Sequence, residues 1–106
     1  MNVVAKRTLL FYADKYPPAS TALKNWNDEI SKSSFGSFNE IKSVYGNASI
    51  IANRRMVFNI KGNSYRLIVS VNFETQNVYF IWFGTHSEYD KIDAAEIKHL
   101  RNPKKS

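Results

Sequence analysis

The sequence of 106 residues contains no cysteine, so it can form neither disulfide bonds nor thiolate metal sites. This absence fits the reducing cytoplasm, which is the location we expect. No apolar run reaches membrane-spanning length, and the N-terminus lacks the pattern of a signal peptide. Internal repeats and low-complexity linkers are also missing. We therefore expect one domain with a single core and no membrane partner.

Acidic residues are few, with nine against fifteen lysines and arginines, and the net charge is +6. Four of the basic residues lie in residues 98–106, which contain no acid, and the rest of the chain carries only +2. We divide the chain into a domain of residues 1–97 and a basic tail of residues 98–106. A second group of basic residues lies within residues 54–73, which contain no carboxylate, and it predicts phosphate binding: Arg54, Arg55, Lys61 and Arg66.

Three runs rich in β-branched and aromatic residues dominate the second half of the chain. They cover residues 54–60, 65–73 and 78–84, and turn residues separate them. Short loops of this kind join antiparallel strands, so we expect a three-stranded meander. The large aromatic residues Trp26 and Trp82 are expected in its core.

The first half of the chain has helical spacing after a short apolar run at residues 1–5, which we interpret as a strand. Helices are predicted over residues 6–16 and 19–32, and a shorter helix follows a capping-box pattern at residues 37–40. Pro17 and Pro18 end the first helix. The fold class is therefore α+β, with an antiparallel sheet, helices packed on one face and the order β-α-α-β-β-β.

The alternation in the second meander strand separates two faces. Leu67, Val69 and Val71 share the face expected against the helices, because successive side chains of a strand point to opposite sides. Arg66 and Ile68 belong to the other face, which we expect to be open to solvent or to a ligand.

Three residues are candidates for catalysis. A histidine ordinarily gains and loses a proton near neutral pH, and His86 is the only histidine within the predicted domain. Tyr89 follows three residues later, so one helical turn would place both side chains on one side. Arg66 comes from the adjacent strand and can neutralise a phosphate. Such a set suits phosphodiester cleavage without a metal or other cofactor.

Structural roles compete with these interpretations. An isolated histidine at a strand end is most often a hydrogen-bonded structural residue, and Asp90 has the pattern of a helix cap. Arg54, Arg55 and Lys61 could equally form a charged edge strand that blocks aggregation. The sequence of the turn leaves Asn63 with no role beyond turn formation.

The chain resembles the HigB family, which belongs to the RelE-like toxins of type II toxin–antitoxin systems. The similar stretches are VFNIKGN at residues 57–63, YRLIV at residues 65–69 and GTHSEYDKID at residues 84–93. The entry Asn53-Arg54-Arg55 and the position of Trp26 are similar too. The chain departs from many relatives at Ile81, where they carry a basic residue, so one phosphate contact is expected to be missing or supplied by the tail.

The resemblance implies a RelE-like microbial-RNase fold and an mRNA interferase that cuts messages, usually on the ribosome, and stops translation. It implies a HigA-type helix-turn-helix antitoxin as partner. It assigns catalysis to His86, Tyr89 and Arg66, and RNA binding to Arg54, Arg55 and Lys61. Two alternatives stay open: a non-catalytic module that binds RNA or an antitoxin through the same face, and a degenerate toxin that only sequesters an antitoxin.

Overall fold

The structure is a computed structural model that describes residues 1–98. The predicted basic tail therefore lies, apart from Lys98, outside the described residues. The elements, in chain order, are β1 (Asn2–Val4), α1 (Lys6–Lys15), a 3-10 turn (Pro17–Ala19), α2 (Ser20–Ser31), α3 (Phe38–Val44), β2 (Ser49–Ile51), β3 (Arg55–Ile60), β4 (Tyr65–Asn72), β5 (Asn77–Thr85) and α4 (His86–Tyr89).

The predicted α+β class, the meander and the helices are confirmed, but the sheet differs from the prediction in two respects. Its order is β1-β5-β4-β3-β2. β1 runs parallel to β5, so the sheet is mixed and not wholly antiparallel. β2 adds an edge strand that pairs with β3. The strand predicted at residues 1–5 is confirmed as β1, whereas β2 was not predicted. Both strands have three residues, and such short runs carry too little alternation to show which strand they pair with.

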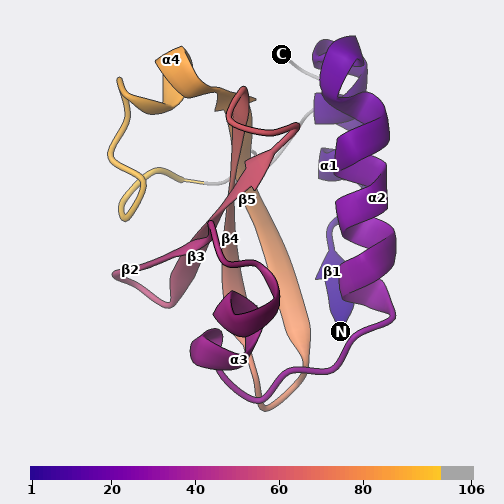
Figure 1. The fold of residues 1–106 in the computed structure, drawn as a ribbon, viewed down its shortest axis with the longest axis vertical. Helices are drawn as coiled ribbons and strands as arrows, with labels where there is room; N and C mark the ends of the chain where they lie inside the picture. Colours follow the sequence, from indigo (N-terminus) through magenta and orange to yellow (C-terminus); the bar gives the residue numbers. More distant parts are fainter. Residues whose placement is uncertain (99–106) are drawn as a thin grey trace.

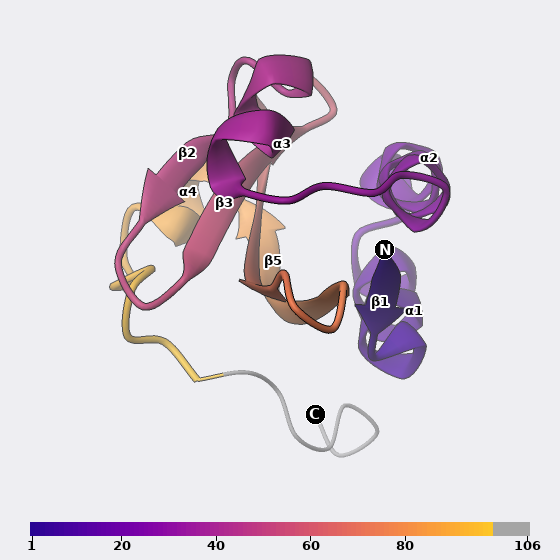
Figure 2. The ribbon, with the colours of Figure 1, turned by 90° about the horizontal axis from the view of Figure 1, so that it is seen from below.

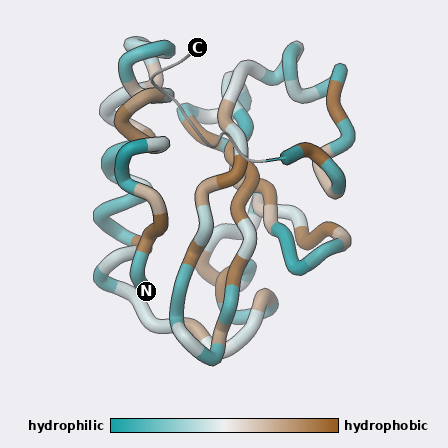
Figure 3. Tube along the Cα trace, turned by 180° about the vertical axis from the view of Figure 1, so that it is seen from behind, coloured by the Kyte–Doolittle hydropathy of each residue, from teal (hydrophilic) through white to brown (hydrophobic). Residues whose placement is uncertain are grey.

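Helices α1 and α2 cover one face of the sheet, as Figures 1 and 2 show. The predicted alternation of β4 is confirmed, because Leu67, Val69 and Val71 are buried against this layer. Trp26 of α2 lies 3% exposed in the same core. Hydrophobic positions accordingly gather along the middle of the sheet in Figure 3, while the turn at its lower end is hydrophilic.

A β-bulge in β5 changes which side chains reach this core. Ile68 of β4 pairs with Trp82, whereas the next residue pairs with Phe80, so Ile81 is the extra residue. A bulge shifts the alternation of the bulged strand. Phe80 and Phe83 therefore both reach the main core. Trp82, which the sequence placed in the core, instead lies half-buried on the opposite face.

The opposite face of the sheet is covered, contrary to the expectation that it would be open. Its central residues Val57, Ile68 and Ile81 are 0–6% exposed. The segment that follows α4 lies over them, and Figure 1 shows it on the side of the sheet away from α1 and α2. Arg66, at the end of this face near α4, is half-buried, and His86 of α4 is exposed. Within residues 1–98, no helix has both the length and the apolar character needed to cross a membrane.

Candidate active site

The site is built at the point where β5 ends and α4 begins. Thr85 caps the helix, since its Oγ1 accepts a hydrogen bond from the Glu88 backbone N–H at 3.1 Å. Glu88 Oε1 accepts in return from the Thr85 backbone N–H at 2.8 Å. This reciprocal capping box satisfies two backbone donors that a helix start would leave unpaired. It fixes His86 as the first helical residue and thereby places His86 and Tyr89 one turn apart.

A second contact ties α4 to the helical layer. The phenol of Tyr16, just beyond α1, donates a hydrogen bond of 2.7 Å to Glu88 Oε1. Hydrogen bonds from the Thr85 backbone and from Tyr16 hold the pKa of Glu88 below its usual range. Burial raises the pKa of the Tyr16 phenol, and the bond to Glu88 raises it further. The pair is therefore a stable phenol–carboxylate bond that orients the start of α4.

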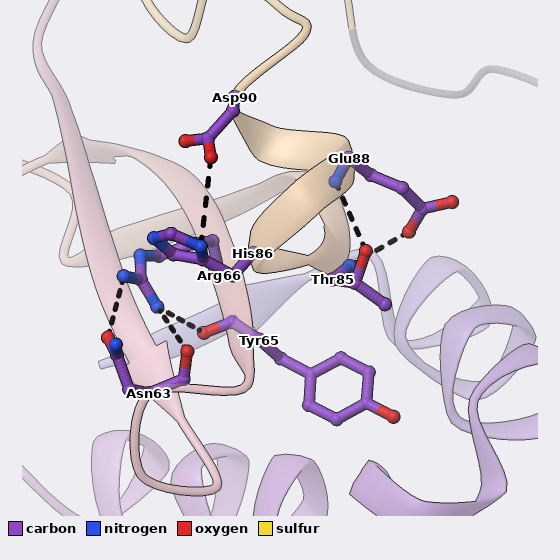
Figure 4. Close-up of polar contacts among 7 residues, drawn as sticks. All are labelled: Asn63, Tyr65, Arg66, Thr85, His86, Glu88 and Asp90. Carbon is purple, nitrogen blue, oxygen red and sulfur yellow. Dashed lines mark hydrogen bonds and ion pairs between the residues drawn. The ribbon is translucent and has the colours of Figure 1, made fainter.

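Arg66 is held by the turn between β3 and β4. Its Nη2 donates 2.7 Å to Oδ1 of Asn63, and its Nη1 donates to the backbone carbonyls of Asn63 and Tyr65 at 3.1 and 3.2 Å (Figure 4). All three acceptors are neutral. Within residues 1–98 no carboxylate pairs with this guanidinium. Its positive charge is thus oriented but not neutralised, which is the state needed for binding a phosphate.

The residue of β5 that pairs with Arg66 is Gly84. A Cβ built at Gly84 would lie 2.6 Å from the indole of Trp82 and 2.9 Å from Glu88 Oε1. Those distances are far below van der Waals contact, so this position accepts only glycine unless the indole moves. The glycine lets Trp82 and Glu88 close over the strand end beside Arg66.

His86 lies beside Arg66 because its backbone N–H donates 2.9 Å to the carbonyl of Ser64. Its ring is accessible, with 46% of the side chain exposed. Nδ1 lies 3.7 Å from Oδ2 of Asp90, one turn further along (Figure 4). This separation suits an ion pair with a protonated imidazole and is too long for a hydrogen bond. Asp90 therefore lies on the Nδ1 side of the ring.

Tyr89 completes the group of predicted catalytic residues. Its half-buried ring lies 6.0 Å from the guanidinium carbon of Arg66 and 6.3 Å from the ring of Trp82. The structure thus brings Arg66, His86 and Tyr89 together at one end of the sheet. An arginine with two protic side chains can hold a phosphodiester and move protons to and from it.

The predicted RNA-binding residues do not form one patch. Lys61 is exposed in the same turn as Asn63, which accepts hydrogen bonds from Arg66. Arg54 and Arg55 lie at the other end of β3, which is six residues long, so they are on the order of 20 Å away from Lys61. Arg54 is exposed, whereas Arg55 is half-buried and donates a hydrogen bond of 2.8 Å to the carbonyl of Ala94.

Two further observations concern ligands. Ile81 is 6% exposed and packs with Val57 and Ile68. The position at which relatives were expected to carry a basic residue is therefore a hydrophobic contact here. Among residues 1–98, no group of three or more histidine or carboxylate side chains gathers as a possible metal site.

The sequence missed two parts of the site. Asn63 holds Arg66, although the spacing Gly62-Asn63 suggested only a turn. Thr85 and Glu88 have the capping-box spacing, so that signal was present in the sequence and could have identified them.

Comparison with known proteins identifies relatives that match most of the chain. The family model of HigB toxins, described as the RelE-like toxic component of a toxin–antitoxin system, matches residues 19–92. A protein of Escherichia coli (strain K12) named mRNA interferase toxin HigB is 32% identical over 96 residues, covering 89% of this chain and 92% of that protein. The mRNA interferase HigB of Shigella flexneri has the same identity and coverage. A protein of the same name from Escherichia coli O6:H1 is 27% identical over 94 residues, 87% of this chain and 91% of its own.

Proposed function

The chain belongs to the HigB family of RelE-like toxins, and on that premise we propose that it is an mRNA interferase, the toxin of a type II toxin–antitoxin system. It cleaves mRNA as an endoribonuclease and so stops translation. One observation carries the proposal: the guanidinium of Arg66 has only neutral partners and lies beside His86 and Tyr89 of α4. That arrangement suits a phosphodiester, whose negative charge the guanidinium can bind while the other two side chains exchange protons with it.

The reaction uses the 2′-hydroxyl of the RNA as nucleophile. A bond forms between this oxygen and phosphorus, and the bond from phosphorus to the 5′-oxygen of the next nucleotide breaks. The 2′-hydroxyl loses a proton and the leaving 5′-oxygen gains one, so the products are a 2′,3′-cyclic phosphate and a 5′-hydroxyl. Arg66 stabilises the charge that accumulates on the phosphate oxygens. His86 transfers a proton, and Tyr89 donates a hydrogen bond or acts as a second acid.

Substrate binding extends beyond the reacting phosphate. Lys61 binds a phosphate beside the site, because it is exposed in the turn that holds Arg66. Arg54 binds a more distant phosphate at the other end of β3, and Arg55 adds positive charge there. Each lost contact should lower the salt slope of RNA affinity by about 0.7.

The ribosome is the place of cleavage in this proposal, and the cytoplasm the compartment. One histidine and one tyrosine are a sparse set of proton-transfer groups, so the ribosome supplies part of the orientation of the message. The partner that neutralises the toxin is a HigA-type helix-turn-helix antitoxin. Comparing cleavage of the same message free and on ribosomes tests whether the ribosome is needed. Sequencing the gene next to the toxin gene tests whether a helix-turn-helix antitoxin is encoded there.

The decisive experiment replaces His86. His86→Ala should lower the rate of single-turnover mRNA cleavage by about 10²–10⁴, the usual contribution of one general acid–base group. RNA affinity and the circular dichroism spectrum should not change. The chain's other histidine supplies the control, since His99→Ala should cleave normally. Wild-type cleavage by folded His86→Ala would contradict the assignment, and an inactive wild-type chain that still binds RNA would favour the non-catalytic module.

A further inference from the structure

The segment that follows α4 forms a strap across the second face of the sheet. We define this strap as residues 92–97. Its backbone turns on itself, with the amides of Glu96 and Ile97 donating to the Asp93 carbonyl at 3.1 and 2.9 Å. Its start is bonded to α4, because the Ile92 amide donates 3.2 Å to the carbonyl of Tyr89. A shift of the strap therefore moves the end of α4.

The far end of the strap is held by the loop between β2 and β3 and the residue after it. Asn53 Nδ2 donates to the carbonyl of Ala95 at 2.7 Å and to the carboxylate of Glu96 at 2.8 Å. Arg55 Nη1 donates to the carbonyl of Ala94 at 2.8 Å. Asn53 and Arg55 thus form a latch of three hydrogen bonds to consecutive strap residues.

The turn that carries Asn53 has a left-handed backbone conformation. Asn53 and Arg54 both have positive φ values, 63° and 60°, although neither is glycine. Asparagine tolerates this region, but arginine rarely adopts it. Both residues lie in the tight turn that joins β2 to β3, where positive φ values are common. Here the conformation directs the side chain of Asn53 toward the strap.

Helix α4 depends on this support. It has four residues and no buried residue, and a helix of one turn has no stability of its own. Its first residues are fixed by the capping box and by Tyr16. Its last residue, Tyr89, packs with the strap residues Ile92, Ala94 and Ile97 against the buried cluster of Val57, Ile68 and Ile81. The strap therefore contributes to the position of Tyr89, and of Asp90 beside it.

We propose that Asn53 and Arg55 are positioning residues for the cleavage reaction, acting through the strap on Tyr89 and on the Asp90–His86 pair. This inference rests on the proposed function, since it assigns Tyr89 and His86 to the chemistry. It also gives Arg55 a main role other than phosphate binding. Small displacements of catalytic groups lower rates strongly, by about 10²-fold for 1 Å.

Asn53→Gly tests the latch without changing the charges that bind RNA. Glycine keeps the positive φ without strain and removes only the side-chain hydrogen bonds, and the net charge does not change. We expect kcat to fall between about tenfold and 100-fold. KM, RNA affinity and its salt slope should remain unchanged. Amide hydrogen exchange should become faster at Ile92 and Ile97 but not at Val69 in the core.

Gln76 supplies a matched control. It also has positive φ, 58°, and its side-chain amide donates to the carbonyls of Phe35 and Phe73 at 2.7 and 2.9 Å. It lies in the turn between β4 and β5, away from the strap. Gln76→Gly removes the same chemistry and should leave cleavage unchanged.

Each outcome of these measurements either supports the proposal or overturns it. Faster exchange of the strap with normal cleavage in Asn53→Gly would reduce the latch to a structural element and overturn the proposal. A parallel loss of RNA affinity would show that the side chain of Asn53 acts in RNA binding and would overturn the proposal too. Arg55→Lys should recover part of the kcat that Arg55→Ala loses, because lysine can still donate to Ala94. An inactive wild-type chain would contradict the proposed function, whereas the exchange measurement would still report whether the latch holds the strap.

Discussion

The two faces of the sheet are covered by layers of very different size. On one face, α1 and α2 bury a core of twenty residues, including Leu23, Trp26 and Leu67. On the other, a strap of six residues and a one-turn helix cover a buried cluster of three. The first face supplies the stability of the fold, and the second holds every residue assigned here to chemistry. Substitutions on the two faces should accordingly separate stability from activity.

The sharpest test of this difference uses two neighbours on β4. Leu67 and Ile68 are both 0% exposed but point to opposite faces. Leu67→Ala should lower the free energy of unfolding by about 2–5 kcal/mol, since the helical layer cannot collapse into the cavity. Ile68→Ala should cost about 2 kcal/mol, the lower end of that range, because the thin strap can relax. Urea denaturation measures both.

The same pair should differ in activity. Ile68 packs beneath Tyr89 and the strap, so Ile68→Ala should lower cleavage under conditions where the protein is fully folded. Leu67→Ala should keep the activity of its folded fraction. Equal losses of stability, with normal cleavage by Ile68→Ala, would show that the second face is simply another part of the core.

The first face could be predicted from sequence because its signals are local. The alternation of Leu67, Val69 and Val71 and the helical spacing around Trp26 each lie within one element. The second face could not. Its cover is a strap whose apolar residues Ile92, Ala94, Ala95 and Ile97 follow no regular period.

The candidate site was also only partly predictable from the sequence. His86, Tyr89 and Arg66 could be grouped because a strand end, a helical turn and an adjacent strand have known geometry. The contact between Asn53 and Ala95 joins residues 42 positions apart, and no spacing rule encodes it. The bulge at Ile81 depends on pairing with β4. The sequence of β5 alone therefore could not show that Phe83 faces the main core and Trp82 the opposite face.

Arg66 tests the chemistry of the second face directly, through the rate of cleavage. Arg66→Ala should lower single-turnover cleavage by about 10²–10³, as for loss of one group that stabilises transition-state charge. Arg66→Lys should lose less but not be normal, because an ammonium cannot reproduce the planar fork. Both should melt near the wild-type temperature, since the acceptors in the turn return to solvent.

Lys61→Ala is the control for Arg66→Ala, because it also removes one positive charge, from the turn that holds Arg66. Lys61→Ala should weaken RNA affinity and lower its salt slope by about 0.7, with a smaller change in the rate at saturating RNA.

A large fall in melting temperature for Arg66→Ala would make Arg66 a structural residue. Full activity of Arg66→Lys would mean that only its charge is needed.

The smallest expected effect is at Glu88, which joins the helical layer to α4. Its pKa is lowered in the folded protein from 4.5, first by the hydrogen bond from the Thr85 backbone. A carboxyl group with a depressed pKa stabilises the fold above pH 4.5, the unfolded value, and this stabilisation is lost as the pH falls through the lower, folded value. Glu88 is exposed, so solvent limits the contribution to a few tenths of a kcal/mol. Glu88→Gln should therefore be slightly less stable than wild type at neutral pH. The difference should shrink as the pH falls below 4.5 and vanish once Glu88 is protonated. Urea denaturation of both proteins across this range measures it, and a difference that grew with acid would show that the carboxylate destabilises α4.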